Sequence, residues 1–221
     1  MDIPANLLPA AYLWGGASLY ALLLCLALLT APWSKIRDSD ALHVYVSTIV
    51  MVTTLWILRG GIQPGLDFHL LGMTLLCLMF EWQFALFAAS LVIIFTTWHG
   101  PAGWEALGVN AILMGALPIL FTRVFLYVAQ RRLPHNFFIY IFVNAFLAGA
   151  LSILLTGVVS VFLQAMADVH HHGRIGNDFL QVLPMLMFGE GFLNGATMAL
   201  LVTYRPQWVA TFHDRWYLNN K

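Results

Sequence analysis

The amino-acid sequence predicts an all-α integral membrane protein, a polytopic bundle of about seven transmembrane helices. Of the 221 residues, 61% are hydrophobic and only 9% are charged, and the mean hydropathy is +0.81. A soluble domain has about a quarter of its residues charged, so this composition is typical of a chain that lies in a bilayer. Long apolar runs follow one another with short loops between them. We therefore expect a single transmembrane domain over residues 1–221.

Each apolar run marks an expected membrane crossing. The runs lie near residues 10–32, 42–58, 67–80, 84–98, 106–128, 136–166 and 179–204. Most of them are long enough to cross about 30 Å of hydrocarbon as a helix. The third and fourth runs are shorter. They are either two short helices joined at residues 81–83 or one long tilted helix.

The distribution of Lys and Arg predicts the orientation of the bundle. With seven spans and the amino terminus outside, eight of these residues lie on the inner side and only Arg59 and Arg174 lie on the outer side. Six spans with the amino terminus inside divide them seven to three. Because cytoplasmic loops carry an excess of Lys and Arg, the sequence favours seven spans with the carboxyl terminus in the cytoplasm. We expect the basic, aromatic tail, residues 205–221, to lie on the inner membrane surface.

The chain begins with the stretch MDIPANLLP, which has no Lys or Arg before the first apolar run. No small-residue cleavage site is evident, so we expect a retained helix and not a cleaved signal peptide. Pro4 and Pro9 keep the stretch out of a helix until about residue 9. We expect it at the outer mouth of the bundle. The alternative is a simple lead-in to the first helix, with Asp2 solvated.

Four polar side chains within the apolar runs are candidates for the site, because polar groups are costly there and often functional. His69 lies near the start of the third run and Asn110 lies in the fifth. Glu190 and Asn194 lie four residues apart, on one helix face of the last run. Each has a structural alternative, because an interior histidine can simply be hydrogen-bonded and an asparagine can join two helices.

Several functional classes lack their sequence signals in this chain. The formal net charge is zero, and neither GxxxxGK[ST] nor GxGxxG occurs, so we expect no nucleic-acid binding and no nucleotide-driven motor within the chain. HExxH is missing too, which argues against an intramembrane metalloprotease. Cys25 and Cys77 fall inside apolar runs, as small core residues do. We expect no enzymatic activity and no organic cofactor.

Four short motifs, taken in order, resemble those of one known family. They are an M-x-I-P-x-x-x-L-P start, H-L-L-G at residues 69–72, G-x-N-x-x-x-M-G at 108–115 and P-x-x-x-x-x-E-G at 184–191. Together they resemble the CbiM/NikM family, the membrane substrate-binding components of energy-coupling-factor transporters for cobalt and nickel. The resemblance covers essentially the whole chain and implies seven spans.

The resemblance implies a metal site formed by the α-amine of Met1, Asp2 and His69. A free α-amine is a nitrogen ligand with a pKa of about 7.7–8, and the amide nitrogens of Asp2 and Ile3 are further donors. Pro4 has no N–H, so a chelate along the backbone must end at residue 3.

Two positions depart from the family pattern. Asp2 stands where the family has histidine, and Leu113 stands where it has a second asparagine. An amine, a carboxylate and an imidazole suit zinc or cobalt as well as nickel. The expected cargo is therefore a divalent transition-metal ion, Ni, Co or Zn.

Further groups are predicted to surround or support this site. Asp67 either supplies another oxygen or caps the helix that follows it. The histidines of the outer loop either capture metal weakly or form a solvated loop. These histidines are His170, His171 and His172. Asn110, Glu190 and Asn194 are expected to support the ligands.

The resemblance implies metal uptake across the bacterial cytoplasmic membrane, in company with a transmembrane coupling protein and cytoplasmic ATP-binding subunits. One alternative is a solitary secondary transporter, or a metal-binding membrane protein without ATPase partners, with Glu190 as a proton relay. A membrane enzyme or haem protein is the least favoured class, since His69 has no histidine partner at its depth on another span.

Overall fold

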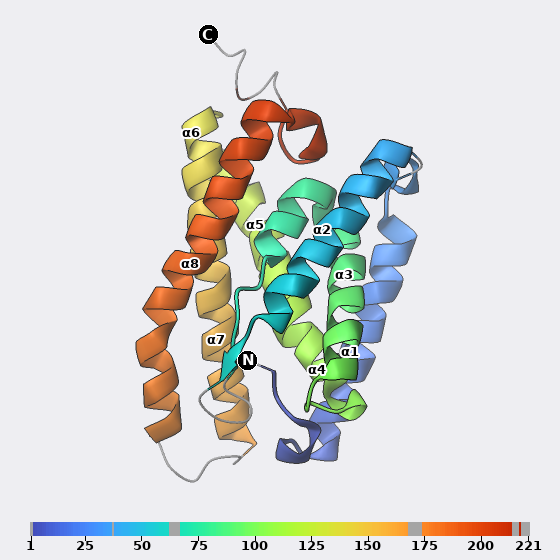
Figure 1. The fold of residues 1–221 in the computed structure, drawn as a ribbon, viewed down its shortest axis with the longest axis vertical. Coiled ribbons are helices and arrows are strands. Elements are labelled where there is room, and N and C mark those ends of the chain that lie inside the picture. The colour runs from blue at the N-terminus through green and yellow to red at the C-terminus, as the bar shows by residue number, and fades with distance from the viewer. Residues whose placement is uncertain (1, 37, 62–66, 168–173, 214–216, 218–221) are drawn as a thin grey trace.

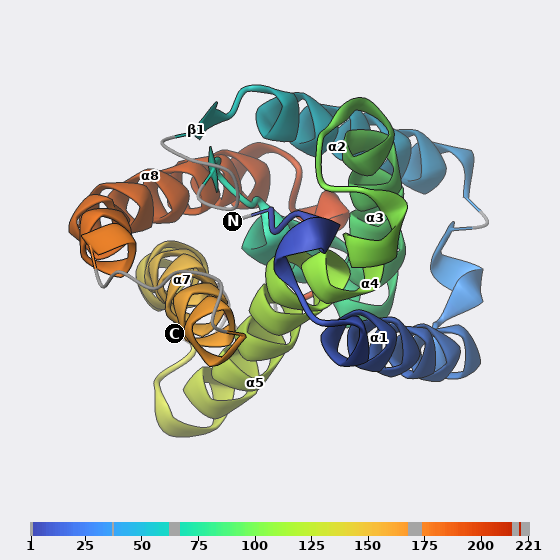
Figure 2. The same cartoon turned by 90° about the horizontal axis from the view of Figure 1, so that it is seen from below.

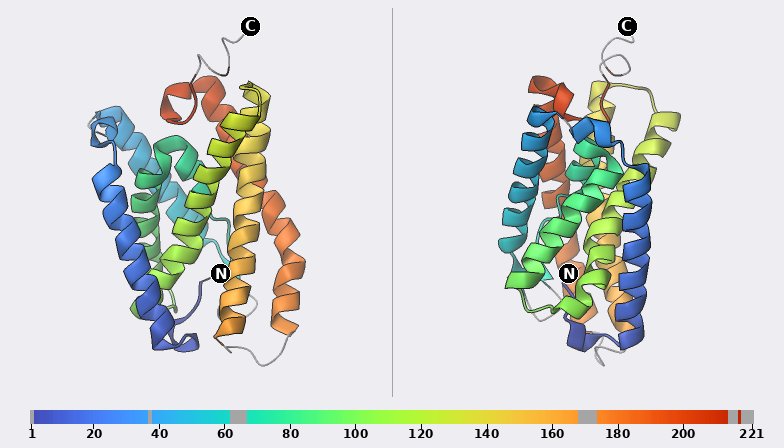
Figure 3. Two further views of the ribbon diagram at one scale, coloured as in Figure 1. Left: turned by 180° about the vertical axis from the view of Figure 1, so that it is seen from behind. Right: turned by 90° about the vertical axis from the view of Figure 1, so that its right-hand side faces the viewer.

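The computed structural model describes residues 2–36, 38–61, 67–167, 174–213 and 217. The long elements in these residues are all helices, which confirms the predicted all-α class. They run along one common direction and form an elongated bundle (Figure 1). A short helix, η1 (Ala5–Leu7), and the start of α1 (Ala10–Thr30) lie at one end, and the last described helical turn, η6 (Pro206–Trp208), lies at the other (Figure 3). We call these the N-terminal end and the C-terminal end of the bundle.

The other elements of the first half are η2 (Trp33–Ile36), α2 (Ser39–Ile57), β1 (Gly60–Gly61), β2 (Asp67–Phe68), α3 (Met73–His99), η3 (Trp104–Ala106), α4 (Leu107–Asn110) and η4 (Ala111–Ala116). Those of the second half are α5 (Leu117–Arg132), α6 (Phe137–Ile139), η5 (Tyr140–Leu147), α7 (Ala148–Met166), α8 (Arg174–Tyr204) and η6 (Pro206–Trp208). η4 and η5 are π-helical, and each runs without a break into its neighbours. The segments α4–η4–α5 and α6–η5–α7 are therefore two continuous rods.

Six helices in the described residues are long and apolar enough to cross a membrane. They are Ala10–Thr30, Ser39–Ile57, Met73–His99, Trp104–Arg132, Phe137–Met166 and Gln181–Tyr204. Five of them coincide closely with predicted runs. The predicted third and fourth runs both fall within α3, so the structure has six such helices where the sequence predicted about seven.

α3 consists of two helical arms joined at Glu81, whose φ of 67° and ψ of 168° are not helical. The first arm, residues 73–80, is only about 12 Å long, which is less than half of the hydrocarbon thickness. We call it the half-helix. In Figure 1 the chain rises through it to the C-terminal end and then descends as the second arm. Of the two alternatives for these runs, two helices joined at the turn is correct.

The half-helix begins part-way along the bundle (Figure 1). The residues before it, 67–72, are not helical. β2 pairs antiparallel with β1, with Gly60 opposite Phe68 and Gly61 opposite Asp67. Gly72 is the N-cap, and its φ of 66° favours glycine. His69 therefore precedes the helix and does not lie within its first turn.

The C-terminal tail holds the other end of the half-helix. The backbone N–H of Ala210 donates to the carbonyl of Met79 at 2.9 Å, and the Thr211 hydroxyl donates to the carbonyl of Leu78 at 2.7 Å. Val209 and Phe212 are buried against the bundle. In its described part the tail thus packs on the bundle, and its place on the inner membrane surface stays a prediction.

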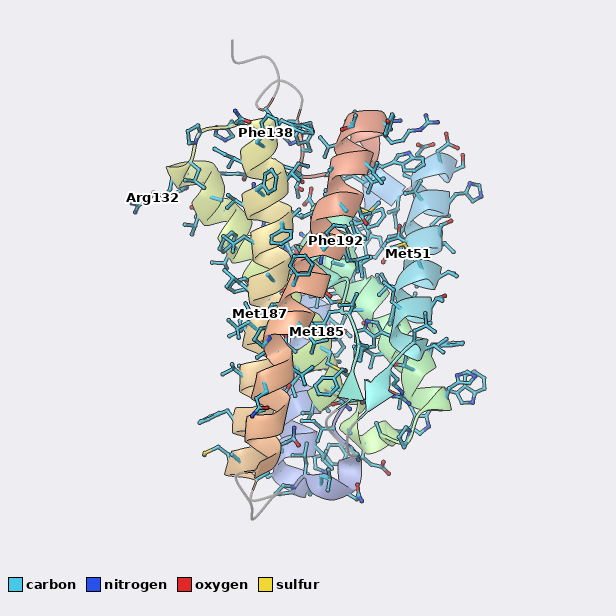
Figure 4. The ribbon with its side chains drawn as sticks, turned by 60° about the vertical axis from the view of Figure 1, so that its left-hand side comes forward. Met51, Arg132, Phe138, Met185, Met187 and Phe192 are labelled. Carbon is cyan, nitrogen blue, oxygen red and sulfur yellow. The ribbon has the colours of Figure 1, made fainter. Side chains whose placement is uncertain are left out.

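The outward helix faces are strongly apolar. Met185, Phe192 and Phe138 are 74%, 61% and 65% exposed, and they point away from the bundle (Figure 4). Some interior polar side chains bond across helices, as where the hydroxyl of Thr74 lies 2.8 Å from that of Thr122. This arrangement fits a multi-pass membrane protein, in which lipid covers the apolar faces.

Candidate metal centre

The amino-terminal segment enters the bundle and does not simply lead into α1. Ile3 is fully buried. Its N–H donates to Oδ1 of Asn110 at 3.0 Å, and its carbonyl accepts from Nδ2 of Asn110 at 3.0 Å. The N–H of Ala5 donates to the carbonyl of Ala102 at 2.8 Å. Seen along the bundle, the described segment that leads to η1 lies inside the ring of helices (Figure 2). For the described residues, the alternative of a plain lead-in with Asp2 solvated is wrong.

Both carboxylate oxygens of Asp2 have partners. Oδ1 accepts a 2.8 Å hydrogen bond from Nδ2 of Asn110, and Oδ2 lies 3.2 Å from a guanidinium nitrogen of Arg59. The side chains of Asp2 and Arg59 are only 11% and 26% exposed. Asn110 therefore fixes the backbone of residue 3 and the side chain of residue 2 at the same time.

The short β1–β2 ladder brings Arg59 and His69 to the same place. Gly60 pairs with Phe68, so one further step of the antiparallel register puts Arg59 opposite His69. Arg59 in turn holds Asp2. Residue 2 and residue 69, far apart in sequence, thus lie around one guanidinium group.

His69 is buried, with 5% of its surface exposed, and packs at 4.5 Å between ring centroids against Trp56. Its Nδ1 lies 3.3 Å from the carbonyl of Leu70. Because a carbonyl only accepts hydrogen bonds, this contact places the proton on Nδ1 and leaves the lone pair of Nε2 for a ligand. Burial lowers the pKa of His69 to about 3, so the imidazole is neutral, which is the form that binds metal.

Glu190 and Asn194 fix the turn that follows His69. The Glu190 carboxylate accepts from the N–H of Leu71 at 2.7 Å and from the N–H of Gly72 at 2.8 Å. Asn194 donates to Oε1 of Glu190 at 3.0 Å. Trp56 donates to the carbonyl of Leu71 at 2.9 Å. These groups hold the loop that carries His69.

Several predicted site residues lie outside what the structure describes. Met1 and the loop histidines, His170, His171 and His172, are among them, as is the side chain of Asp67. The alternative reading of Asp67 as a helix cap is wrong, because Gly72 is the N-cap of the half-helix. Within the described residues, no three His, Cys, Asp or Glu side chains come together to hold a metal ion. Asp2 and His69 alone do not form a complete set.

The comparison with known proteins identifies the family. Residues 2–208 match the CbiM family, described as the cobalt uptake substrate-specific transmembrane region. The chain belongs to the CbiM family. This match spans nearly all of the sequence, from the amino-terminal segment to η6, and it confirms the family predicted from the four motifs.

Two solved structures share the CbiM-family fold of this chain. One is a truncated transition metal transporter and the other is a transition metal transporter. Each superposes with a TM-score of 0.71 at 16% identity over 94% of this chain, covering 99% and 93% of the other chains respectively. No curated protein matches the chain in sequence.

A large cavity lies away from the predicted ligands of this CbiM-family protein. It has a volume of about 1000 Å³ and opens between α2, the half-helix and the segment after α8. Its lining includes Asp40, His43, Arg205 and Trp208. Neither Asp2 nor His69 contributes to it, so it is distinct from the candidate metal centre.

Arg59 is the residue that sequence reasoning missed. In the sequence it is only one of two positive charges assigned to the outer side. Its place at the end of an apolar run, directly before Gly60 and Gly61, was a signal that the chain turns there. The pairing with Asp2 was not readable, because 57 residues separate the two.

Proposed function

We propose that this CbiM-family protein is the metal-binding membrane component of an uptake system for a divalent transition-metal ion. Three groups form the site in this proposal: the α-amine of Met1, the carboxylate of Asp2 and Nε2 of His69. The amide nitrogen of Asp2 is a further donor. The protein performs no chemistry on its cargo, and its task is to take the ion from outside and hold it.

The observation that carries the proposal is the buried amino-terminal segment next to the β1–β2 ladder. Asn110 holds both backbone groups of Ile3, and Asp2 then reaches Arg59, which is next to the ladder that leads to His69. The N–H of Ile3 donates its hydrogen bond to Asn110, so the amide nitrogen of residue 3 is no longer among the expected metal donors. A chelate therefore involves residues 1 and 2 only.

The donor types limit the cargo. An amine and an imidazole are nitrogen ligands that suit nickel, cobalt and zinc, and a carboxylate favours zinc or cobalt over copper. Around these donors, Asn110, Glu190 and Asn194 act as supports through the hydrogen bonds described above. Asp67 is proposed to supply a further oxygen, and the histidines at 170–172 are proposed to capture metal ions weakly.

The N-terminal end of the bundle faces outward in this proposal, in accord with the charge distribution of the sequence. The protein lies in the bacterial cytoplasmic membrane and works with a transmembrane coupling protein and cytoplasmic ATP-binding subunits. The alternative, a solitary secondary transporter, makes a different prediction. Uptake by the isolated chain would then continue in cells that lack the ATP-binding subunits.

The direct test is elemental analysis of the full chain, purified with a free amino terminus and a carboxyl-terminal tag after growth with Ni, Co and Zn salts. We expect close to one transition-metal ion per chain, and less in Asp2→Ala and His69→Ala. Metal content that is unchanged in both variants would contradict the proposed site. Uptake of a radioactive isotope with and without ATP-binding subunits then separates the two transport modes.

A further inference from the structure

Arg59 is a positive charge at a site proposed to take a cation. Its guanidinium nitrogen lies 3.2 Å from Oδ2 of Asp2, and both side chains are largely buried. It also packs over the backbone of Gly100, where an added Cβ would lie 3.1 Å from a guanidinium nitrogen. Arg59 is thus enclosed between the amino-terminal segment and the loop that follows α3.

A guanidinium on Asp2 has two opposite consequences for a metal ion. It holds the carboxylate in one orientation, which favours binding. It also places one positive charge beside the position of a divalent cation, and repulsion between charges a few ångströms apart is strong where water is largely excluded. Asn110 donates to Oδ1 at 2.8 Å and a guanidinium nitrogen of Arg59 lies 3.2 Å from Oδ2, so a metal ion that binds Oδ2 must displace Arg59.

We infer that Arg59 is a resident cation that competes with the metal cargo for Asp2, so that loading of the site requires the guanidinium to leave Oδ2. This inference rests on the proposed function and names the residue that sets the affinity of its site. Arg59 lies at the junction of α2 and β1, and its register partner across the ladder is His69.

A purely structural role for Arg59 leads to the opposite expectation. If the ion pair only fastened the amino-terminal segment, its loss would free Asp2 and weaken metal binding. If Arg59 competes with the cargo, its loss strengthens binding, because Asn110 still holds the segment through Ile3 and Asp2. The sign of the change in affinity separates the two roles.

The experiment is titration of the purified full chain, with a free amino terminus and a carboxyl-terminal tag, with Ni²⁺, Co²⁺ and Zn²⁺ chlorides. We expect Arg59→Gln to bind the preferred ion on the order of tenfold more tightly than the unmodified protein, because one positive charge beside the ion is lost. Arg59→Lys keeps the charge and should stay within about threefold of the unmodified protein. Arg132→Gln, at an exposed position that points away from the bundle (Figure 4), is the matched control and should bind as the unmodified protein does.

A double-mutant cycle with Asp2→Asn completes the test. In the Asp2→Asn background, Arg59→Gln should increase affinity by much less than in the unmodified background, because the competition is for the carboxylate. Thermal melting of each variant without metal checks that the fold is intact. Unchanged or weaker binding by a folded Arg59→Gln protein would overturn the inference while leaving the proposed function standing. If neither the unmodified chain nor Arg59→Gln binds any of the three ions, the proposed function itself fails.

Discussion

The carboxylate of Glu190, within α8, accepts a 2.7 Å hydrogen bond from the backbone N–H of Leu71, two residues after His69. A second hydrogen bond from Gly72 reaches the same carboxylate. These are N–H groups at the start of the half-helix, where the helix dipole favours a negative charge. A helix that begins at membrane depth has no water for its first N–H groups, so a carboxylate from another helix satisfies them. Glu190 thus anchors the loop that follows His69.

The first prediction concerns this anchor. Glu190→Gln retains one acceptor oxygen but turns an amide N–H₂ toward a backbone N–H. One of the two donors is then left unpaired, and we expect a loss of about 1–3 kcal/mol of stability. Metal affinity should fall about 10–100-fold, as is typical when a group that orients a ligand is changed. Thermal melting and metal titration measure the two effects.

Glu105→Gln is the matched control for this variant. Glu105 is an exposed carboxylate on η3, at the same end of the bundle, and its loss should change neither quantity. A Glu190→Gln protein with unmodified metal affinity would show that the anchor does not position His69.

The second prediction concerns Asn110. Asn110→Ala removes the grip on Ile3 and the hydrogen bond to Asp2, and it leaves the buried N–H and carbonyl of Ile3 without their partner. We expect a loss of about 1–3 kcal/mol of stability for the unpaired groups and at least a tenfold loss of metal affinity. Asn136→Ala is the control. Oδ1 of Asn136 accepts a 2.8 Å hydrogen bond from the N–H of Phe138 at the other end of the bundle, far from the candidate site. Equal loss of affinity in both variants would argue against a specific role for Asn110.

The helical spans were predictable because a bilayer requires long apolar segments whose backbone groups are satisfied internally. Hydropathy therefore located five of the six long helices directly. The turn at Glu81 was harder, because nothing local requires a left-handed φ at a glutamate. Glu81 forms an ion pair at this turn with Lys35 of η2, which is 46 residues earlier in the sequence. The strands β1 and β2 are two residues each, too short for a periodic pattern.

The candidate site was predictable only in part. His69, Asn110 and Glu190 could be recognised as polar residues in apolar runs. The two prolines indicated that the chain begins with a non-helical segment. Their partners were not visible, because the contacts of Asp2 with Asn110 and of Leu71 with Glu190 span 108 and 119 residues. Spacing within a helix reveals neighbours four residues apart, but it carries no information on contacts between distant helices.

The third prediction compares two sets of histidines. If His69 is a direct ligand, His69→Ala should cost more metal affinity than changing His170, His171 and His172 to alanine together. The loss should exceed the 10–100-fold cost of changing a supporting group. Metal titration of the two variants measures this. A loss that is larger in the triple variant would move the principal site to the outer loop.

The fourth prediction concerns pH. Metal binding must displace the proton of the Met1 α-amine, so affinity should fall as the pH drops below about 7.7–8. His69 alone would normally add a second fall near pH 6.5. Burial lowers the pKa of His69 to about 3, so the imidazole is already neutral and that second fall should be missing. Titration between pH 5 and pH 9 tests this, and a clear step near pH 6.5 would show that His69 is solvated before metal binds.

The fifth prediction uses the orientation implied by the charges and returns to the amino terminus. A carboxyl-terminal fluorescent reporter that matures only in the cytoplasm should glow, and a periplasmic enzyme reporter there should be silent.

In that orientation the amino-terminal segment opens outward, and its amine must be free to bind metal. A formyl group, an acetyl group or an amino-terminal tag withdraws the lone pair, and a tag must also pass the buried Ile3 and its hydrogen bonds to Asn110. The same chain with its tag moved to the carboxyl terminus keeps both features. We therefore expect metal binding and uptake in the carboxyl-tagged protein and a large loss of both in the amino-tagged one. Equal activity of the two would mean that the α-amine is not a ligand, and the site would then have to be built from Asp2, His69 and groups of the outer loop.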